Sequence, residues 1–410
     1  MCVQLTQSYF AKTLETLCAE GYVSKIAVAV SGGADSLCLA LMAHDWAVDR
    51  GIKVIGLTVD HGLRPESAAE AEQVHAWLTE RKMAHHILTW TGDKPKTRVE
   101  EKAREARYRL LLDWCHHQKV SCLLLGHQLE DQAETFFLRL ARSSGIDGLS
   151  AMRPVTIREG VFLVRPFLDV HRDSIRGYLR THYRQKWIED PSNQDDQYER
   201  VRLRKAAPIL SQLGLTPQAV SLSAKRLARV RCCLETLTDS FLKKQVVWSH
   251  GGYAFIPSEA WENLPQEIAL RVLSFVLETI GGGSVPRLEQ LEKRCRPQMQ
   301  AQTLAGCEIV PCRTGFYVCR EWAQMAAPVR LKAETPTHWD RFYVCVSKAA
   351  TIAPLQEALS QTGLPAKVRR TLPALYDGKT LLWVPSLDYY AKKDDINGTV
   401  VLKVSKWKKM

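Results

Sequence analysis

Residues 31–36 read Ser-Gly-Gly-Ala-Asp-Ser and directly follow the apolar run 25–30. The two glycines lack a Cβ, so the backbone can turn sharply there and approach a polyanion closely. The next stretch, 37–43, predicts a helix whose free N–H groups and dipole would point at bound phosphates. The sequence therefore predicts a phosphate-binding loop, with a tight strand-to-helix connection as the alternative. The residues expected at the nucleotide are Ser31, Gly32, Gly33, Ala34, Asp35 and Ser36.

Asp35 stands at the predicted helix start and cannot bind phosphate directly, because like charges repel. A carboxylate beside phosphates is typical of a Mg²⁺ ligand. The loop is not a Walker A motif, since no Gly-Lys-Ser/Thr follows it.

A second group of polar residues includes three that lie on one predicted helix face. His127, Asp131 and Glu134 follow i, i+4 and i+3 steps after the apolar run 120–125. Acidic residues in a first turn could merely complement the helix dipole, which explains Asp131 better than Glu134. A histidine and two carboxylates aimed at a phosphate site suit metal binding and amine handling, so we favour a functional role.

The elements that must position these residues alternate between apolar strands and amphipathic helices. Strands are predicted at 25–30, 53–59, 85–89 and 120–125, with helices between them. Near-continuous apolar strands indicate a parallel sheet covered on both faces, and ligands bind such sheets beyond the carboxyl ends of the strands. Polar residues just past three strands should therefore meet at one edge, namely Ser31, Asp60 and His127. Asp60 and His61 follow the second strand at this edge, and the family resemblance given below implies that they lie at the nucleoside of ATP, although Asp-His-Gly alone is an ordinary turn.

Composition places the chain among globular proteins. Its 410 residues favour two to three domains, 46% of them are hydrophobic, and no apolar run is long enough to span a membrane. The N-terminus lacks a signal-peptide layout, and the 12 cysteines include no Cys-x-x-Cys. We expect a cytoplasmic protein with buried thiols. The net charge of +12 suits a polyanionic partner.

Basic residues gather in one segment that marks a change of character. Residues 200–231 hold eight Lys and Arg residues and no Asp or Glu. We predict domains at 1–215, 216–330 and 331–410, the second mainly helical and the third a small α+β unit. An RNA backbone is the plausible partner of the basic segment, although such runs are usually solvated faces.

Taken together and in order, these motifs resemble the tRNA(Ile)-lysidine synthase family of N-type (PP-loop) ATP pyrophosphatases. The resemblance is strong over residues 22–210 and weaker beyond. It rests on segments 31–36, 60–64, 100–108, 127–135 and 142–152, on Arg165-Pro166, and on Asp190, Ser192 and Asn193. Three positions depart from the family pattern: Glu130 replaces Asp, Ser143 replaces Gly, and Val201 replaces an Asn whose role cannot be carried over.

The resemblance implies an α/β catalytic domain with a parallel PP-loop sheet and two further domains. It implies that ATP adenylates the wobble cytidine of tRNA(Ile) with a CAU anticodon, that Mg²⁺ assists, and that free L-lysine then displaces AMP from carbon 2. Codon specificity would change from AUG to AUA. A homodimer is a further expectation that the sequence leaves open.

The resemblance also implies roles for individual residues. Asp35, Asp131 and Glu134 would be catalytic, with Asp35 and Asp131 at the metal, and the sequence does not say which carboxylate handles the lysine amine. The residues expected at tRNA or substrate are Arg104, Arg107, His127, Arg142, Arg200, Arg204, Arg226 and Arg229. The alternatives are another PP-loop tRNA-modifying enzyme such as a 2-thiocytidine synthase, a small-molecule amide ligase, and a non-catalytic RNA-binding protein. Missing Cys-x-x-Cys pairs argue against the first of these.

Overall fold

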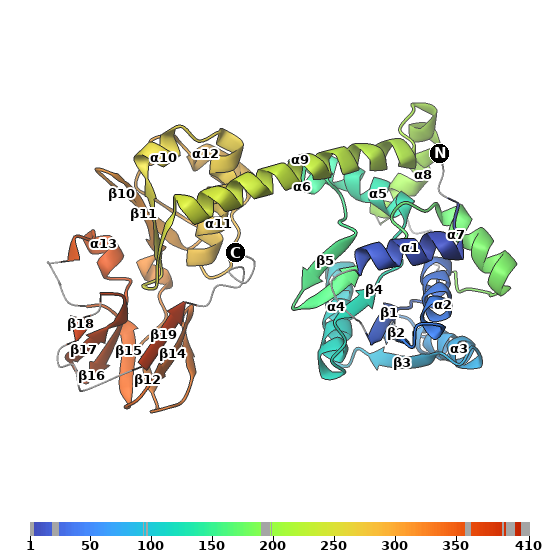
Figure 1. Ribbon diagram of the computed structural model, residues 1–410, viewed down its shortest axis with the longest axis horizontal. Helices are drawn as coiled ribbons and strands as arrows, with labels where there is room; N and C mark the ends of the chain where they lie inside the picture. The colour runs from blue at the N-terminus through green and yellow to red at the C-terminus, as the bar shows by residue number, and fades with distance from the viewer. Residues whose placement is uncertain are drawn as a thin grey trace. The chain divides into compact units, whose positions relative to one another are not determined.

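The computed structural model describes residues 4–18, 24–92, 94–95, 97–189, 197, 199–356, 362–387, 389–390 and 398–402. The chain divides into two compact units, 1–231 and 232–410, and the boundary falls inside the long helix α9 (Pro217–Lys244) (Figure 1). The division into three domains at 215 and 330 stays a prediction.

The first unit is built on one sheet that confirms the predicted PP-loop architecture. Its six strands take the order β3-β2-β1-β4-β6-β5. All neighbouring pairs are parallel except β5 with β6, which form an antiparallel hairpin at the sheet edge. The strands are β1 (Lys25–Ala29), β2 (Lys53–Asp60), β3 (Ala84–Thr89), β4 (Cys122–Leu124), β5 (Val155–Arg158) and β6 (Val161–Val164).

Helices cover both faces of this sheet, as the apolar strands predict. Ile26 and Val28 of β1 belong to the core under one set of helices, whereas Ala27 packs into the core on the opposite face. The first set is α1 (Gln7–Leu17), α2 (Ala34–Val48), α3 (Ser67–Glu80) and α7 (Arg172–Tyr178), and α4 (Val99–His117) covers the other face (Figure 1). The period of two along β1 is that of a strand buried on both sides.

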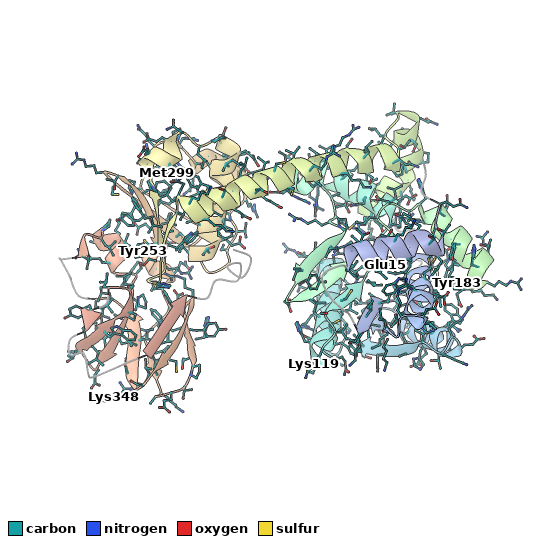
Figure 2. All side chains as sticks on the ribbon, in the orientation of Figure 1. Glu15, Lys119, Tyr183, Tyr253, Met299 and Lys348 are labelled. Atoms are coloured by element: carbon teal, nitrogen blue, oxygen red, sulfur yellow. The ribbon has the colours of Figure 1, made fainter. Side chains whose placement is uncertain are left out.

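The remaining helices of this unit follow β4 and β6. They are α5 (Leu129–Leu140), α6 (Ile146–Leu149), the π-helix η1 (Leu179–Tyr183) and α8 (Glu199–Gln212). Tyr183, labelled in Figure 2, donates its hydroxyl hydrogen bond to Asp45 Oδ2 of α2 at 2.6 Å. This bond ties the α7–η1 segment to the C-terminal part of α2.

The second unit contains three antiparallel sheets. The first has the order β7-β8-β11-β10-β9, the second β12-β15-β16-β17-β18, and the third β13-β14-β19. The bounds are β7 (Val247–Ser249), β8 (Tyr253–Pro257), β9 (Gln302–Leu304), β10 (Cys307–Cys312), β11 (Gly315–Arg320), β12 (Val329–Leu331), β13 (Thr337–Trp339), β14 (Phe342–Val346), β15 (Ala350–Pro354), β16 (Pro373–Asp377), β17 (Thr380–Val384), β18 (Tyr389–Tyr390) and β19 (Gly398–Leu402).

The α-helices beside these sheets in the described residues are α10 (Ser258–Glu262), α11 (Gln266–Ile280), α12 (Leu288–Arg294) and α13 (Ala366–Arg369), and two short 3-10 helices are η3 (Trp322–Gln324) and η5 (Pro385–Leu387). The sequence predicts the helix at α11 and the strands around 307–318, but it does not predict β7 and β8, which complete a five-stranded sheet in the middle region. Among the described residues, no helix combines the length and apolarity needed to cross a membrane.

Candidate nucleotide and RNA site

Hydrogen bonds of its own serines stabilise the loop between β1 and α2. The Ser31 N–H donates to Ser36 Oγ at 3.1 Å, and the Ser36 hydroxyl donates to the Gly33 carbonyl at 3.0 Å. Gly33 is the N-cap of α2 and provides no side-chain cap, so the first-turn amides of α2, from Ala34 onward, remain available to an anion.

Gly32 is the position in this loop where a side chain cannot be tolerated. Its φ of +86° lies in the left-handed region, and an added Cβ would lie 2.9 Å from Ile188 Cδ1 and 3.0 Å from Val74 Cγ2. The Gly32 carbonyl also accepts a hydrogen bond from the Ile188 N–H at 2.9 Å. The segment after η1 therefore braces the loop, a contact that the sequence does not predict.

The end of β2 lies beside this loop, as predicted, because β2 pairs with β1 in parallel. Asp60 Oδ1 accepts from the Gly62 N–H at 2.9 Å and from the Ser67 hydroxyl at 2.6 Å. His61 follows it, half-buried. Asp60 thus stabilises the turn into α3, as in an ordinary Asx turn.

The third predicted segment enters α5 through a capping box. Asp131 Oδ2 accepts from the Gln128 N–H at 3.0 Å, and Gln128 Oε1 accepts from the Glu130 N–H at 2.6 Å. Just before this cap, Gly126 lies against the start of α2: an added Cβ would be 3.1 Å from both Ser36 Cα and Ser36 N. The close approach brings the His127 segment and the phosphate loop together.

Two buried carboxylates, Asp35 and Asp131, interact electrostatically across this contact. Burial raises the pKa of Asp35 to about 7, and the negative charge of Asp131 adds to the shift, while Arg172 and Arg176 oppose it. Burial likewise raises the pKa of Asp131, helped by Glu134. Asp35 Oδ1 is buried and has no hydrogen-bond partner among the described residues. A cation between these groups would remove both penalties.

Glu134, one turn further along α5, is engaged by arginines. Its Oε1 accepts from Arg204 Nε at 2.7 Å and its Oε2 from an Arg204 terminal nitrogen at 3.3 Å. Arg172 lies 3.6 Å from the same carboxylate. Its neighbour Glu130 accepts from His171 Nδ1 at 2.9 Å and from the Arg172 N–H at 3.1 Å.

A cavity of about 140 Å³ opens at these charges. Its polar lining includes Glu130, Glu134, Arg172 and Arg204. Most of the remaining wall is apolar and comes from α5, from α8 and from the turn that leads to α9, with Ala133, Phe137, Leu203, Ala207, Leu210, Leu215 and Pro217. The cavity therefore suits a small ligand with an aliphatic stem and charges of both signs.

A cluster of positive charge surrounds His127. Burial lowers the pKa of His127 to about 3, and Arg165, Arg107, Arg104 and Arg200 lower it further, so its imidazole is neutral at pH 7. It can exchange hydrogen bonds with a base but adds no positive charge. The cluster concentrates positive charge beside His127, and such a field would attract an anion.

The basic segment 200–231 is less uniform than its sequence indicates. Arg204 pairs with Glu134, Lys225 Nζ lies 2.5 Å from Asp169 Oδ1, and Arg231 is buried. Two of its basic residues thus have acidic partners, and these partners come from distant parts of the chain. Arg226 and Arg229 are exposed on α9.

One predicted substrate residue lies at the periphery of this unit. Arg142 forms an exposed ion pair with Glu199 at 2.5 Å. The positions Asp190, Ser192 and Asn193 lie outside the described residues.

Sequence reasoning misses the contributions of α7 and of the segment that follows it. Arg172 and Arg176 act on Asp35, and Ile188 braces Gly32, although they are more than 130 residues away in the chain. The only signal is an unusual density of arginine in 165–184. No group of three or more His, Cys, Asp and Glu side chains within the described part of the chain is arranged to hold a metal by itself.

The chain resembles known proteins over most of its length. Residues 6–210 match the PP-loop domain family. A tRNA(Ile)-lysidine synthase of Ruegeria pomeroyi is 35% identical over 378 residues, which cover 88% of each chain. The tRNA(Ile)-lysidine synthase of Wolbachia pipientis wMel is 34% identical over 406 residues, covering 92% of this chain and 94% of the relative. That of Methylobacterium nodulans is 40% identical over 293 residues, covering 70% and 85%.

Proposed function

Because the chain belongs to the tRNA(Ile)-lysidine synthase family, we propose that it uses ATP to join free L-lysine to carbon 2 of the wobble cytidine in tRNA(Ile) with a CAU anticodon. The observation that carries this proposal is one edge of the parallel sheet. There the phosphate loop, the Asp35–Asp131 pair, neutral His127 and the charged cavity at Glu134 are neighbours.

The first step is adenylation of the cytosine carbonyl oxygen, which attacks the α-phosphorus of ATP as pyrophosphate leaves. The amides of Gly32 to Ser36 at the start of α2 would hold the departing pyrophosphate. Asp60 and His61 would border the nucleoside. Positioning and charge neutralisation dominate such chemistry, so a rigid loop is what the reaction needs.

The residues present fit a Mg²⁺ ion. The buried, unpartnered Asp35 Oδ1 and the repulsion from Asp131 are the features that a bound cation would relieve. Mg²⁺ is commonly held by one or two carboxylates together with substrate phosphates, so a protein site of three ligands is not required. Asp35 and Asp131 would hold it, and when bound it would neutralise charge on the phosphates.

The second step needs a lysine amine in its neutral form. An unperturbed lysine has a pKa of about 10.4, so a carboxylate must orient the amine and accept its proton. The cavity supports this role: its apolar wall would take the methylene stem, Arg172 or Arg204 the lysine carboxylate, and Glu134 the amine. Glu134 would then exchange its bond to Arg204 for one to the lysine. Asp131 remains the alternative acceptor.

The RNA would be held by the cationic cluster. Arg104, Arg107 and Arg200 would contact tRNA phosphates, and neutral His127 would hydrogen-bond the target base. Arg226 and Arg229 would extend the contact along α9, and Arg142 would join once its pair with Glu199 opens. We further propose that the enzyme acts in the cytoplasm, where tRNA and ATP meet. Assembly as a homodimer stays a prediction that gel filtration would test.

The alternative is sulfur insertion, the chemistry of a 2-thiocytidine synthase. It receives less support, because the sequence has no Cys-x-x-Cys pair and the relatives reported above are lysidine synthases. Incubating the protein with ATP, labelled lysine, sulfide and a tRNA(Ile) transcript separates the two functions. Lysine incorporation at the wobble cytidine is expected, and a protein that incorporates sulfide instead would refute the proposal.

The lysine step is tested by Glu134→Gln. We expect lysine transfer to slow by about 100-fold while pyrophosphate release continues and adenylated tRNA accumulates. Loss of the Arg204 partner should cost about 1–3 kcal/mol of unfolding free energy, so the unfolding midpoint is measured alongside. Glu134→Asp should restore part of the transfer rate. The control Glu267→Gln breaks the Arg271 pair at 2.9 Å in the second unit and should leave transfer unchanged. A native transfer rate in Glu134→Gln would remove Glu134 from the mechanism.

A further inference from the structure

A second concave surface of the first unit lies outside the site described above. It is a groove of about 510 Å³ along α4, between the end of β3 and the β5–β6 hairpin. Its lining is aromatic and charged, with Trp90, Lys102, Glu105, Arg109, Arg158 and Glu159. Neither the phosphate loop nor the cavity at Glu134 shares a lining residue with it.

Trp90 is anchored next to the predicted nucleotide site. Its backbone N–H donates to the Asp60 carbonyl at 2.8 Å, so the residue follows β3 at the same sheet edge as the end of β2. The Lys94 ammonium lies 4.3 Å from the centroid of the Trp90 ring. The half-buried ring therefore has a fixed backbone and a cation against it, and it also borders the groove.

Positive charges connect this groove to the surroundings of His127. The guanidinium carbons of Arg104, Arg107 and Arg158 lie 5.2, 5.5 and 5.1 Å from the centroid of the buried Tyr108 ring. Arg104 and Arg107 also act on His127, whereas Arg158 lines the groove. Cations thus extend from the surroundings of His127, past Tyr108 on α4, to the groove.

The chemistry of this row matches single-stranded RNA. A phosphate backbone follows exposed cations, and an unstacked base finds a partner in an aromatic ring. The groove carries three cations, Lys102, Arg109 and Arg158, and two carboxylates, Glu105 and Glu159. The ion pair between Arg158 and Glu159 is long, at 3.8 Å. The wobble base must leave its stack to reach the catalytic edge, so its neighbours in the loop lose a stacking partner.

We propose that the groove binds an unpaired nucleotide of the tRNA anticodon loop next to the wobble cytidine, with its base stacked on Trp90. The inference rests on the proposed function, because it takes the RNA substrate from there. Lys102, Arg109 and Arg158 hold the phosphates on either side. Trp90 is accordingly a positioning residue: it holds the loop while chemistry proceeds at its neighbour.

The test pairs protein variants with altered RNA. Trp90→Ala should raise the KM for tRNA(Ile) by about ten-fold, as expected for one lost stacking contact, with kcat and the KM for ATP unchanged. Trp90→Phe keeps an aromatic face and should retain most of the affinity. Transcripts that carry an abasic residue at each position flanking the wobble cytidine supply the second half of the cycle. One of these abasic transcripts should raise the KM of the native enzyme by the same factor, and it should not raise the KM of Trp90→Ala any further.

Each other outcome overturns the proposal. An unchanged KM in Trp90→Ala removes the stacking contact. A loss of equal factor on every transcript, including all abasic ones, means that the ring only supports the fold. A raised KM for ATP instead of tRNA assigns the ring to the nucleotide. If the native protein forms no lysidine, the proposed function fails, and filter binding of the same transcripts to both proteins still decides the stacking contact.

Discussion

Replacing Asp35 by Asn should stabilise the protein at alkaline pH while it abolishes pyrophosphate release. Burial and Asp131 raise the pKa of Asp35 to about 7, from the ordinary value of 3.8. As the pH rises from 3.8 to about 7, Asp35 loses its proton in the unfolded chain but keeps it in the folded state, so the folded state becomes less stable. The penalty is absent below 3.8, grows between 3.8 and about 7, and stays at its full value above.

The size of the penalty follows from the shift. About three pKa units at about 1.36 kcal/mol each amount to about 4 kcal/mol at pH 8 in the absence of Mg²⁺. Asn carries no charge, so Asp35→Asn should regain most of that free energy at pH 8 and less than about 1 kcal/mol at pH 4. The pH dependence of the gain distinguishes the buried charge from a general packing effect.

The assay is urea unfolding of both proteins in metal-free buffer at pH 4, 6 and 8, followed by pyrophosphate release with ATP and tRNA. Mg²⁺ should raise the unfolding free energy of the native protein and not that of the variant, because ligand binding to the folded state stabilises it. Asp49→Asn, at the exposed end of the same helix, is the matched control. An equal gain at pH 4 and pH 8, or undiminished pyrophosphate release, would refute the reasoning.

Two further predictions test the contact at the catalytic edge and the RNA surface. Gly126→Ala places a Cβ 3.1 Å from the Ser36 backbone, which should cost about 1–3 kcal/mol in urea unfolding and slow pyrophosphate release by about ten-fold. Gly177→Ala, with no atom within 4 Å of the added Cβ, should do neither; equal behaviour of the two variants would contradict the prediction. Replacing Arg226 and Arg229 by Ala should reduce the slope of log K against log salt by about 0.7–0.9 per lost phosphate contact. Filter binding at several salt concentrations measures it, and an unaltered slope would mean that tRNA docks elsewhere.

The sequence predicts the catalytic unit well where local pattern decides the structure. The apolar runs at 25–30 and 53–59 become β1 and β2, within a residue of the predicted bounds, because strands buried on both faces have a distinctive composition. The short strands β7 and β8 are missed, because segments of three and five residues carry little periodic signal. β8 also ends in a proline, Pro257. β7 pairs with β8 in a local hairpin, and β8 joins the sheet through β11, which lies outside any local window.

The site, too, can be predicted only where the local sequence decides the position of a residue. Ser31, Asp60 and His127 can be placed from the ends of their strands, and the structure brings them to one edge. The pairing of Glu134 with Arg204 cannot be predicted in this way, because it depends on how α8 packs against α5 over 70 residues of sequence. The run of cations therefore looks uniform in the sequence, although the fold pairs Arg204 with the buried Glu134 and Lys225 with the half-exposed Asp169.

Local structure also explains how a costly pair of carboxylates is held in place. Asp131 closes its own helix by accepting from the Gln128 amide, and this hydrogen bond opposes the cost of burying its charge next to Glu134. Gly126, two residues before the N-cap Gln128, allows this cap to approach the first turn of α2. A four-residue pattern thus satisfies α5 and presents a second carboxylate to the phosphate loop. The proposed metal role of Asp131 is compatible with its cap, because the cap uses Oδ2 and leaves Oδ1 for a ligand.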